Sequence, residues 1–268
     1  MNPFLDVAME AAAEAGAMLR EACARPKNIA YKGEVDLVTE SDRRSEELIV
    51  RRLRSRFPDH AIVAEEGGGT EAASARYCWH VDPLDGTTNF AHSYPCFAVS
   101  IGLAEAGEPV AGVVLNPISG ELFSAARGEG ARLNGREIRV SNIEKLATSL
   151  VATGFPTRQR ASSANIHYYW QFTLQSHGVR RDGSAALDLC SVACGRFEGF
   201  WEFGLNSWDT AAGMLIVREA GGMVTDLLGQ PYSPGGEHVL ATNGRVHGEM
   251  QAVAGDIMKR AATASLKF

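Results

Sequence analysis

The sequence predicts an α+β fold with two subdomains that share a cleft. Apolar residues recur at helical spacing near the N-terminus, residues 97–140 contain short β-type runs, and helices and strands mix after residue 140. The 268 residues suffice for one large domain or two closely packed subdomains. No linker or repeat interrupts the chain, so we expect subdomains over 1–145 and 146–268.

Two amphipathic helices are expected at the start of the chain. Residues 3–22 and 42–56 place apolar side chains every three or four positions, and Pro58 follows the second helix, where proline is common. The intervening segment Tyr31–Thr39 is polar and β-branched, and it predicts a strand or a loop.

Five strands are expected next. Ala61–Glu65 and Tyr77–Val81 are short apolar runs that end at acidic residues, and we expect the Gly67-Gly68-Gly69 loop between them to be mobile. The other three strands, separated by glycine and proline, are Phe97–Ala104, Val110–Asn116 and Glu121–Ala126, and Asn134-Gly135 marks a turn.

Two helices are expected in the second half. Ser184–Cys194 is followed by Gly195, and Asp209–Ala220 is followed by Gly221-Gly222. Glycine is the residue that most often ends a helix, because it adopts the left-handed backbone without strain.

Composition narrows the functional class. A net charge of −6 argues against non-specific binding of nucleic acid, which relies on a basic field. No apolar run approaches the roughly 20 residues of a membrane span, and the first residues lack the basic start of a signal peptide. We therefore expect a small-molecule partner and neither a membrane nor a nucleic-acid partner.

The cysteines indicate a reducing compartment. The chain has five, an odd number at scattered positions, so we expect a cytoplasmic protein. Cys190 and Cys194 are four residues apart on the expected helix, and we interpret them as buried thiols because no further pair or nearby histidine completes a zinc site.

The most informative segment is Trp79-His80-Val81-Asp82-Pro83-Leu84-Asp85-Gly86-Thr87-Thr88-Asn89. It places two carboxylates three residues apart across a proline, immediately before a Gly-Thr turn. Carboxylates bind hard cations, and the free amides of such a turn or helix start receive phosphate oxygens. We expect the strand to end at Asp82, because proline discourages further pairing. A structural alternative is an acidic turn that caps a helix.

The sequence argues against two other phosphate-handling classes. Phosphatases of the haloacid dehalogenase class carry their two acids at i and i+2 on one strand, whereas Asp82 and Asp85 are at i and i+3. No Gly-x4-Gly-Lys-Ser/Thr sequence occurs, so a P-loop is absent.

Three other segments carry candidate residues. Glu65 and Glu66 are adjacent, so one of them, Glu65, is expected to enter the site. Asp42 either lies in an ordinary helix start, with Thr39 as the cap, or orients a hydroxyl or a water. Asp209 is either a simple acid in the first turn of a helix or a metal ligand from the second subdomain.

Together these segments resemble the inositol monophosphatase family, which belongs to the magnesium-dependent, lithium-sensitive phosphatase superfamily that includes fructose-1,6-bisphosphatase. The matching segments follow the family order and are Val35-Asp36-Leu37-Val38-Thr39 with Asp42, Ala64-Glu65-Glu66, Asp82-Pro83-Leu84-Asp85-Gly86-Thr87-Thr88-Asn89-Phe90, Gly183-Ser184-Ala185-Ala186, Glu202, and Trp208-Asp209 with Glu219-Ala220-Gly221-Gly222. The resemblance implies a layered α/β/α/β/α sandwich with a metal-binding cleft, and a homodimer.

The resemblance also implies roles for individual residues. Glu65, Asp82 and the Leu84 carbonyl would hold a first Mg²⁺, and a weaker third ion would use Glu65. Asp82, Asp85 and Asp209 would hold the second Mg²⁺. The catalytic group would be Glu65, Asp42 and Thr87, the last two acting on the attacking water. The substrate contacts would be Gly86, Thr87, Ser184, Ala185, Glu202 and Asp209, with Arg180 and Asp182 nearby.

The leading hypothesis is Mg²⁺-dependent hydrolysis of a phosphate monoester by direct attack of water. The Glu202 position suits a polyol, so we expect an inositol-1-monophosphatase, with histidinol phosphate or fructose 1,6-bisphosphate as alternative substrates. His167-Tyr168-Tyr169-Trp170, the aromatic cluster, is expected in the core or at a dimer interface. A protein that binds cations without turnover is the hypothesis from another class.

Overall fold

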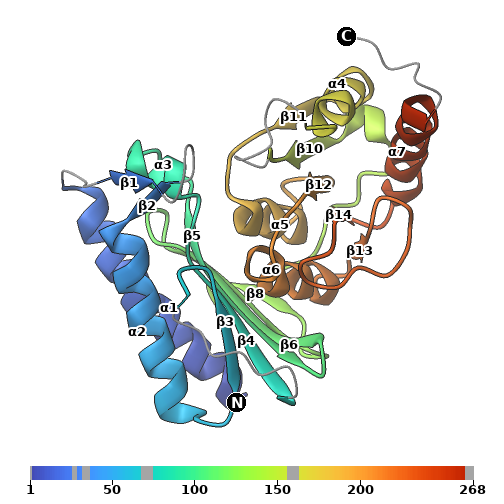
Figure 1. Cartoon of the computed structure of the whole chain (residues 1–268). Helices are drawn as coiled ribbons and strands as arrows, with labels where there is room; N and C mark the ends of the chain where they lie inside the picture. Colours follow the sequence, from blue (N-terminus) through green and yellow to red (C-terminus); the bar gives the residue numbers. More distant parts are fainter. Residues whose placement is uncertain (1, 26–28, 32–36, 68–74, 156–162, 263–268) are drawn as a thin grey trace.

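The computed structural model describes residues 2–25, 29–31, 37–67, 75–155 and 163–262. Over these residues, helices and sheets alternate in layers: two helices, a seven-stranded sheet, two helices, a five-stranded sheet and two further helices (Figure 1). The layering confirms the α+β sandwich. None of the described helices is both long and apolar enough to cross a membrane.

The first layer consists of α1 (Pro3–Cys23) and α2 (Glu40–Arg56), which lie side by side on the larger sheet (Figure 1). Asn2 caps α1 by accepting hydrogen bonds from the amides of Phe4 and Leu5. The apolar faces of both helices pack on the sheet in one cluster that includes Leu19, Ile49 and Trp79. The helices predicted over 3–22 and 42–56 are confirmed, the second starting two residues earlier.

The larger sheet has the order β3-β4-β5-β6-β7-β8-β9. Its strands are β3 (Ala61–Ala64), β4 (Tyr77–Asp85), β5 (Ala98–Glu105), β6 (Glu108–Asn116), β7 (Glu121–Ala126), β8 (Ala131–Leu133) and β9 (Arg136–Glu137). Only β3 and β4 pair in parallel, and the other neighbours are antiparallel. Asn134 and Gly135 turn between β8 and β9 with positive φ angles, as their sequence predicts.

One strand boundary differs from its prediction. We expected pairing to end at Asp82, but β4 continues through Pro83 to Asp85. The register of β4 on β5 shifts between Asp82 and Asp85, and β3 pairs with β4 only as far as Val81. The missing amide hydrogen of Pro83 therefore falls at a bulge, where no ladder bond is lost.

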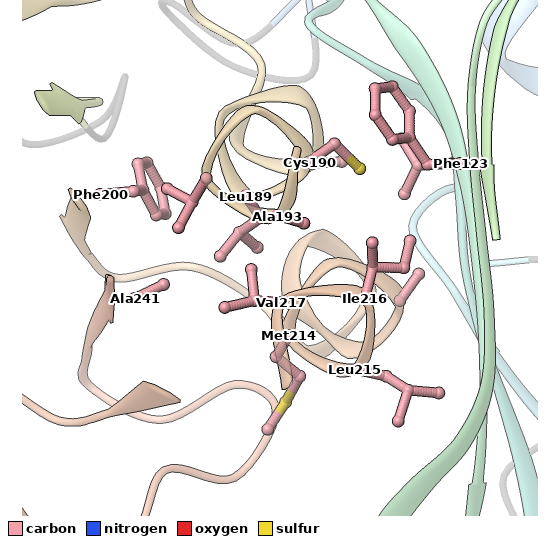
Figure 2. Packing of buried hydrophobic residues seen from close by; sticks show 14 of the residues in the cluster. Phe123, Leu189, Cys190, Ala193, Phe200, Met214, Leu215, Ile216, Val217 and Ala241 are labelled. Atoms are coloured by element: carbon pink, nitrogen blue, oxygen red, sulfur yellow. The ribbon is translucent and has the colours of Figure 1, made fainter. Parts of the chain in front are cut away.

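The middle layer contains α5 (Ala185–Ala193) and α6 (Ser207–Glu219), which touch both large sheets. Figure 2 shows Leu189 and Val217 packed between Phe200 of the smaller sheet and Phe123 of the larger one. The approach to the larger sheet is close at Gly112, where a Cβ would lie 2.9 Å from the Cα of Ala212. The helices predicted over Ser184–Cys194 and Asp209–Ala220 are confirmed.

The second sheet has the order β11-β10-β12-β14-β13. Its strands are β10 (Leu150–Thr153), β11 (Gly178–Arg180), β12 (Gly199–Phe203), β13 (Met223–Thr225) and β14 (His238–Thr242). Its outer face is covered by α4 (Asn165–Gln175) and α7 (His247–Ala262) (Figure 1). A short 3-10 turn, η1 (Leu146–Thr148), precedes it.

The remaining elements are small. A two-stranded sheet pairs β1 (Ile29–Tyr31) with β2 (Leu37–Thr39), and α3 (Thr87–Ala91) follows β4. The parts of the expected motifs at 32–36, and Gly68 and Gly69, lie outside the described residues. The division into 1–145 and 146–268 stays a prediction, since α5 and α6 pack on both large sheets.

Two other expectations concern side chains whose packing is now visible. Cys190 is buried, Cys194 is half-buried, and both are free. Burial raises the pKa of both thiols, as expected for structural cysteines. Tyr168 belongs to the core beside Phe203, whereas Trp170 is 58% exposed.

The contact between α6 and the sheet generates a stability prediction. We expect Gly112→Ala to lower the free energy of unfolding by about 1–3 kcal/mol, because the added methyl group overlaps the backbone of Ala212. Gly255→Ala is the matched control: it lies in α7 with open space at its Cβ position, so it should stabilise by up to about 1 kcal/mol. Urea unfolding measures the free energy of unfolding of both variants. Equal changes in the two variants would contradict the close approach of α6 to the larger sheet at Gly112.

Candidate active site

The bulge in β4 places the two acids of the Asp-Pro-Leu-Asp motif. Asp82 pairs with Ser100 and Asp85 with Ala98, so two residues of β4 lie between these pairs without a partner in β5. Asp82 Oδ1 accepts the amide of Leu84 at 2.9 Å. Ser45 of α2 donates to the Pro83 carbonyl at 2.8 Å, which fixes the bulge against the first layer.

Gly86 and Thr87 turn the chain into α3. Gly86 has a φ of 90°, and a Cβ there would lie 3.0 Å from the Cys96 carbonyl oxygen. Both the backbone conformation and the lack of space therefore favour glycine at this position. The Thr87 hydroxyl lies 3.0 Å from Asp42 Oδ1 and 3.1 Å from the Leu84 carbonyl oxygen, either of which can accept its hydrogen. Asp42 is fully buried in the first turn of α2, so the structure brings these predicted partners together.

Asp85 is held by the N-terminus of α5. Its Oδ2 accepts the Ser184 hydroxyl at 2.6 Å and the Ala186 amide at 2.8 Å. Burial raises the pKa of Asp85 to about 6, and these hydrogen bonds oppose the rise because they favour the carboxylate. Ser184, predicted as a substrate contact, thus orients Asp85 across the join between the two halves.

Asp209 lies at the start of α6, as predicted. Its Oδ2 accepts the Asn206 amide at 2.6 Å in a capping box. Burial, and then the charge of Asp85, raise the pKa of Asp209 to about 8. Two contacts fix this helix start on the larger sheet: Ser207 Oγ lies 2.9 Å from His80 Nδ1, and Ser100 donates to the Trp208 carbonyl at 3.2 Å.

Glu65 completes the carboxylate group. It follows β3, one residue beyond the last strand residue, and its amide donates to the Val81 carbonyl at 3.2 Å. Burial raises the pKa of Asp82 well above its ordinary value, and the charges of Glu65, Asp85 and Asp209 raise it further. The other three predicted acids therefore lie within electrostatic reach of Asp82.

The neighbouring Glu66 occupies a different environment. Its amide donates to Glu46 Oε2 of α2 at 2.6 Å. Glu65 raises the pKa of Asp82, whereas Glu66 is not among the groups that act on it. Which of the two glutamates enters the site stays a prediction.

Glu202 approaches the same acids from the second sheet. It is buried on β12, and a Cβ at Gly154 would overlap its carboxylate, so the absence of a side chain at Gly154 gives Glu202 its space. Burial raises the pKa of Glu202, and Asp209 and Asp85 raise it further, whereas Arg181 lowers it. Ala185 lies beside Ser184 at the start of α5 and is also buried.

The candidate metal ligands are carboxylate and carbonyl oxygens, which suit a hard divalent cation. Within the described residues, however, no three side chains of the Asp, Glu, His or Cys type already converge as a metal-binding group. The Oδ2 atom of Asp85 accepts the Ala186 amide of α5, and the Oδ2 atom of Asp209 accepts the Asn206 amide at the start of α6. The arrangement gathers candidate ligands without fixing which of their atoms would bind.

Sequence reasoning missed one connection that builds the site. Asn89, the last residue of the motif segment, donates from Nδ2 to the carbonyls of Cys96 at 2.6 Å and Asp182 at 2.7 Å. It thereby ties the loop before β5 to the loop before α5. An asparagine beside a Gly-Thr turn was visible in the sequence, but its two partners are set by tertiary structure alone.

A sequence model of the inositol monophosphatase family matches residues 1–260 of this chain. The chain belongs to the inositol monophosphatase family. Inositol-1-monophosphatase from Synechocystis is 48% identical over 257 residues, which cover 95% of this chain and 90% of that protein. Nus factor SuhB from Pseudomonas aeruginosa is 46% identical over 250 residues, 91% of this chain and 92% of the relative.

The fold agrees with solved structures of the inositol monophosphatase family. The inositol monophosphatase from Anabaena superposes with a TM-score of 0.87 at 42% identity, over 94% of this chain and 95% of that one. The resemblance seen in the motifs is therefore confirmed over nearly the whole chain.

The raised pKa values predict how stability depends on pH. Asp85 and Asp209, with folded-state pKa values of about 6 and 8, bind protons more tightly folded than unfolded, where aspartate titrates near 3.9. Their contribution to stability is complete below pH ~4 and is lost as pH rises through about 6 to 8. In chelator-treated protein we expect the free energy of unfolding to fall over this range, by at most about 1.4 kcal/mol per pH unit for each proton.

Urea unfolding of the wild type and Asp209→Asn at pH 5, 6, 7 and 8 measures this slope. The variant should show a flatter dependence, because amide nitrogen and oxygen do not titrate. Identical slopes for the two proteins would contradict the raised pKa of Asp209.

Proposed function

We propose that this member of the inositol monophosphatase family hydrolyses phosphate monoesters with Mg²⁺ as cofactor. The observation that carries the proposal is the group of four acids, Glu65, Asp82, Asp85 and Asp209, that repel one another beside the Gly86-Thr87 turn. Like charges gathered at a buried site need cations, and the free amides of a Gly-Thr turn suit a phosphate. Family membership and the name of the Synechocystis relative support the same activity.

The proposed ligand sets follow the donor groups. Glu65, Asp82 and the Leu84 carbonyl would hold a first ion, and Asp82, Asp85 and Asp209 a second, with Glu65 available to a third. Magnesium, when bound, would lower the pKa of water and neutralise charge on the phosphate. The oxygen chemistry of these groups fits Mg²⁺, which prefers carboxylate, carbonyl and water ligands.

Thr87 and Asp42 are proposed to orient the attacking water. The buried Asp42 carboxylate lies within hydrogen-bond distance of the Thr87 hydroxyl, so that hydroxyl can donate to Asp42 and accept a hydrogen from water. The amides of Gly86 and Thr87 would hold the phosphate oxygens. A simple cation-binding protein would not need the Asp42–Thr87 pair, which disfavours the non-enzymatic alternative.

The substrate is proposed to be an inositol monophosphate. Glu202, buried beside Asp209 and Asp85, offers acceptor oxygens for hydroxyl groups of a polyol. Ala185 would lie against the same ligand. Histidinol phosphate and fructose 1,6-bisphosphate remain the alternatives, because the metal motif is shared across the superfamily.

Several further properties follow from the family and stay predictions: inhibition by lithium, a homodimer, and a cytoplasmic location. The name of the Pseudomonas aeruginosa relative describes a Nus factor. The net charge of −6 gives this chain no overall basic field for nucleic acid, so we propose a small-molecule partner.

The test is phosphate release by chelator-stripped protein with and without Mg²⁺. Myo-inositol 1-phosphate, L-histidinol phosphate and fructose 1,6-bisphosphate are compared at equal concentration. We expect Mg²⁺-dependent release with preference for the inositol ester. Binding of Mg²⁺ without release from any of the three would favour a non-catalytic role.

Asp82→Asn tests the central ligand. We expect turnover to fall by roughly 10³-fold or more, because the variant loses the carboxylate shared by both proposed ion sites. Asp256→Asn, an exposed acid on α7, is the control and should retain activity. Circular dichroism and thermal melting check that both variants fold. Near-normal turnover in folded Asp82→Asn would contradict the proposed role of Asp82 as a ligand of both ions.

A further inference from the structure

Asp188 is a buried acid for which the proposed mechanism has no use. Its side chain is 2% exposed, and its Oδ2 has no hydrogen-bond partner among the described residues. An unpaired carboxyl oxygen is costly to bury, so such an atom calls for an explanation. The only other buried side-chain atom of this kind in the described part of the chain is Ser176 Oγ.

Asp188 lies on the face of α5 that is directed to the active site. It follows Ser184 by four residues and Ala185 by three, which places these residues on one side of the helix. Ser184 contacts Asp85 directly. Leu189 and Cys190, the next two residues of α5, pack in the apolar layer between the sheets, Leu189 toward Phe200 and Cys190 toward Phe123 (Figure 2).

The surroundings of Asp188 are those of the proposed substrate pocket. Helix α5 packs on β12, the strand that carries Glu202. After burial, the charge of Glu202 is the largest influence that raises the pKa of Asp188, followed by Asp182 and Asp85, while Arg181 lowers it. Asp188 and Glu202 are therefore two buried acids on packed elements, and Asp85 lies within electrostatic reach of both.

We infer that Asp188 is a second hydroxyl-binding residue, which together with Glu202 selects a leaving group that carries several hydroxyls. The inference rests on the proposed function. The unpaired Oδ2 of Asp188 would receive a hydroxyl hydrogen that no described protein group supplies. Two acceptors from different elements, α5 and β12, fit two hydroxyls of one polyol ring better than a single alcohol.

The test compares recognition of the polyol with recognition of phosphate. Asp188→Leu keeps the approximate size of the side chain and removes both oxygens. We expect the KM for myo-inositol 1-phosphate to rise about 10-fold, because the hydrogen bond from a substrate hydroxyl to the buried Asp188 carboxyl oxygen is lost. The Ki of inorganic phosphate as a product inhibitor should stay within about twofold, because phosphate does not reach Asp188.

A stability measurement separates function from structure. Removal of an unpaired buried carboxyl should leave the thermal midpoint of Asp188→Leu equal to or above that of the wild type. Ser176→Ala removes the other unpaired atom, outside the site, and should leave the KM unchanged. If Asp188→Leu does not fold, Asp188→Asn carries the test: it loses one of two oxygens, and its KM should rise about threefold with the phosphate Ki unchanged.

The outcomes distinguish the two proposals. An unchanged KM, or a KM and a phosphate Ki that rise together, would overturn the role of Asp188 while the phosphatase activity stands. Absence of Mg²⁺-dependent release by the wild type would overturn the proposed function and this inference with it. If the wild type prefers L-histidinol phosphate, the proposed selection of a polyol by Asp188 and Glu202 is overturned, whereas the proposed phosphatase activity stands.

Discussion

The negative charges of Glu65, Asp82, Asp85 and Asp209 gather where the two halves of the chain meet. Several contacts around these acids offset the cost of their burial and mutual repulsion. Burial and neighbouring charge raise the pKa of Asp82 and Asp209 above their ordinary values. Donors from two helices offset part of this cost: the Ser184 hydroxyl and Ala186 amide on Asp85, and the Asn206 amide on Asp209. The two donors on Asp85 also join the larger sheet to the middle helical layer.

The packing of the layers depends on the same junction. Glycines 102 and 112 let α6 approach the larger sheet, so that Asp209 reaches the end of β4. The contacts from Ser100 and His80 to the start of α6 set its position along the strands. Asn89 connects the loops before β5 and α5. The site is therefore a property of the whole sandwich, because its groups come from opposite sides of residue 145.

Sequence reasoning reached the residues whose chemistry is encoded locally. The Asp82–Asn89 segment predicts a carboxylate and phosphate site because its spacing, proline and glycine act over neighbouring residues. The end of β4 was placed wrongly, since whether Pro83 breaks a strand depends on what pairs with it. Asp188 was missed because an acid inside the apolar run of α5 can be linked to the site only once the packing of α5 on β12 is known. The individual ligand and catalytic roles stay predictions.

The most direct test of this account is the number of protons released when Mg²⁺ binds. Isothermal titration calorimetry of chelator-treated protein at pH 7, in two buffers with different ionisation enthalpies, gives this number. Acids with raised pKa values must lose protons to hold a cation, so we predict net release that becomes smaller in Asp209→Asn. Mg²⁺ binding without proton release, or no Mg²⁺ binding at all, would contradict the account.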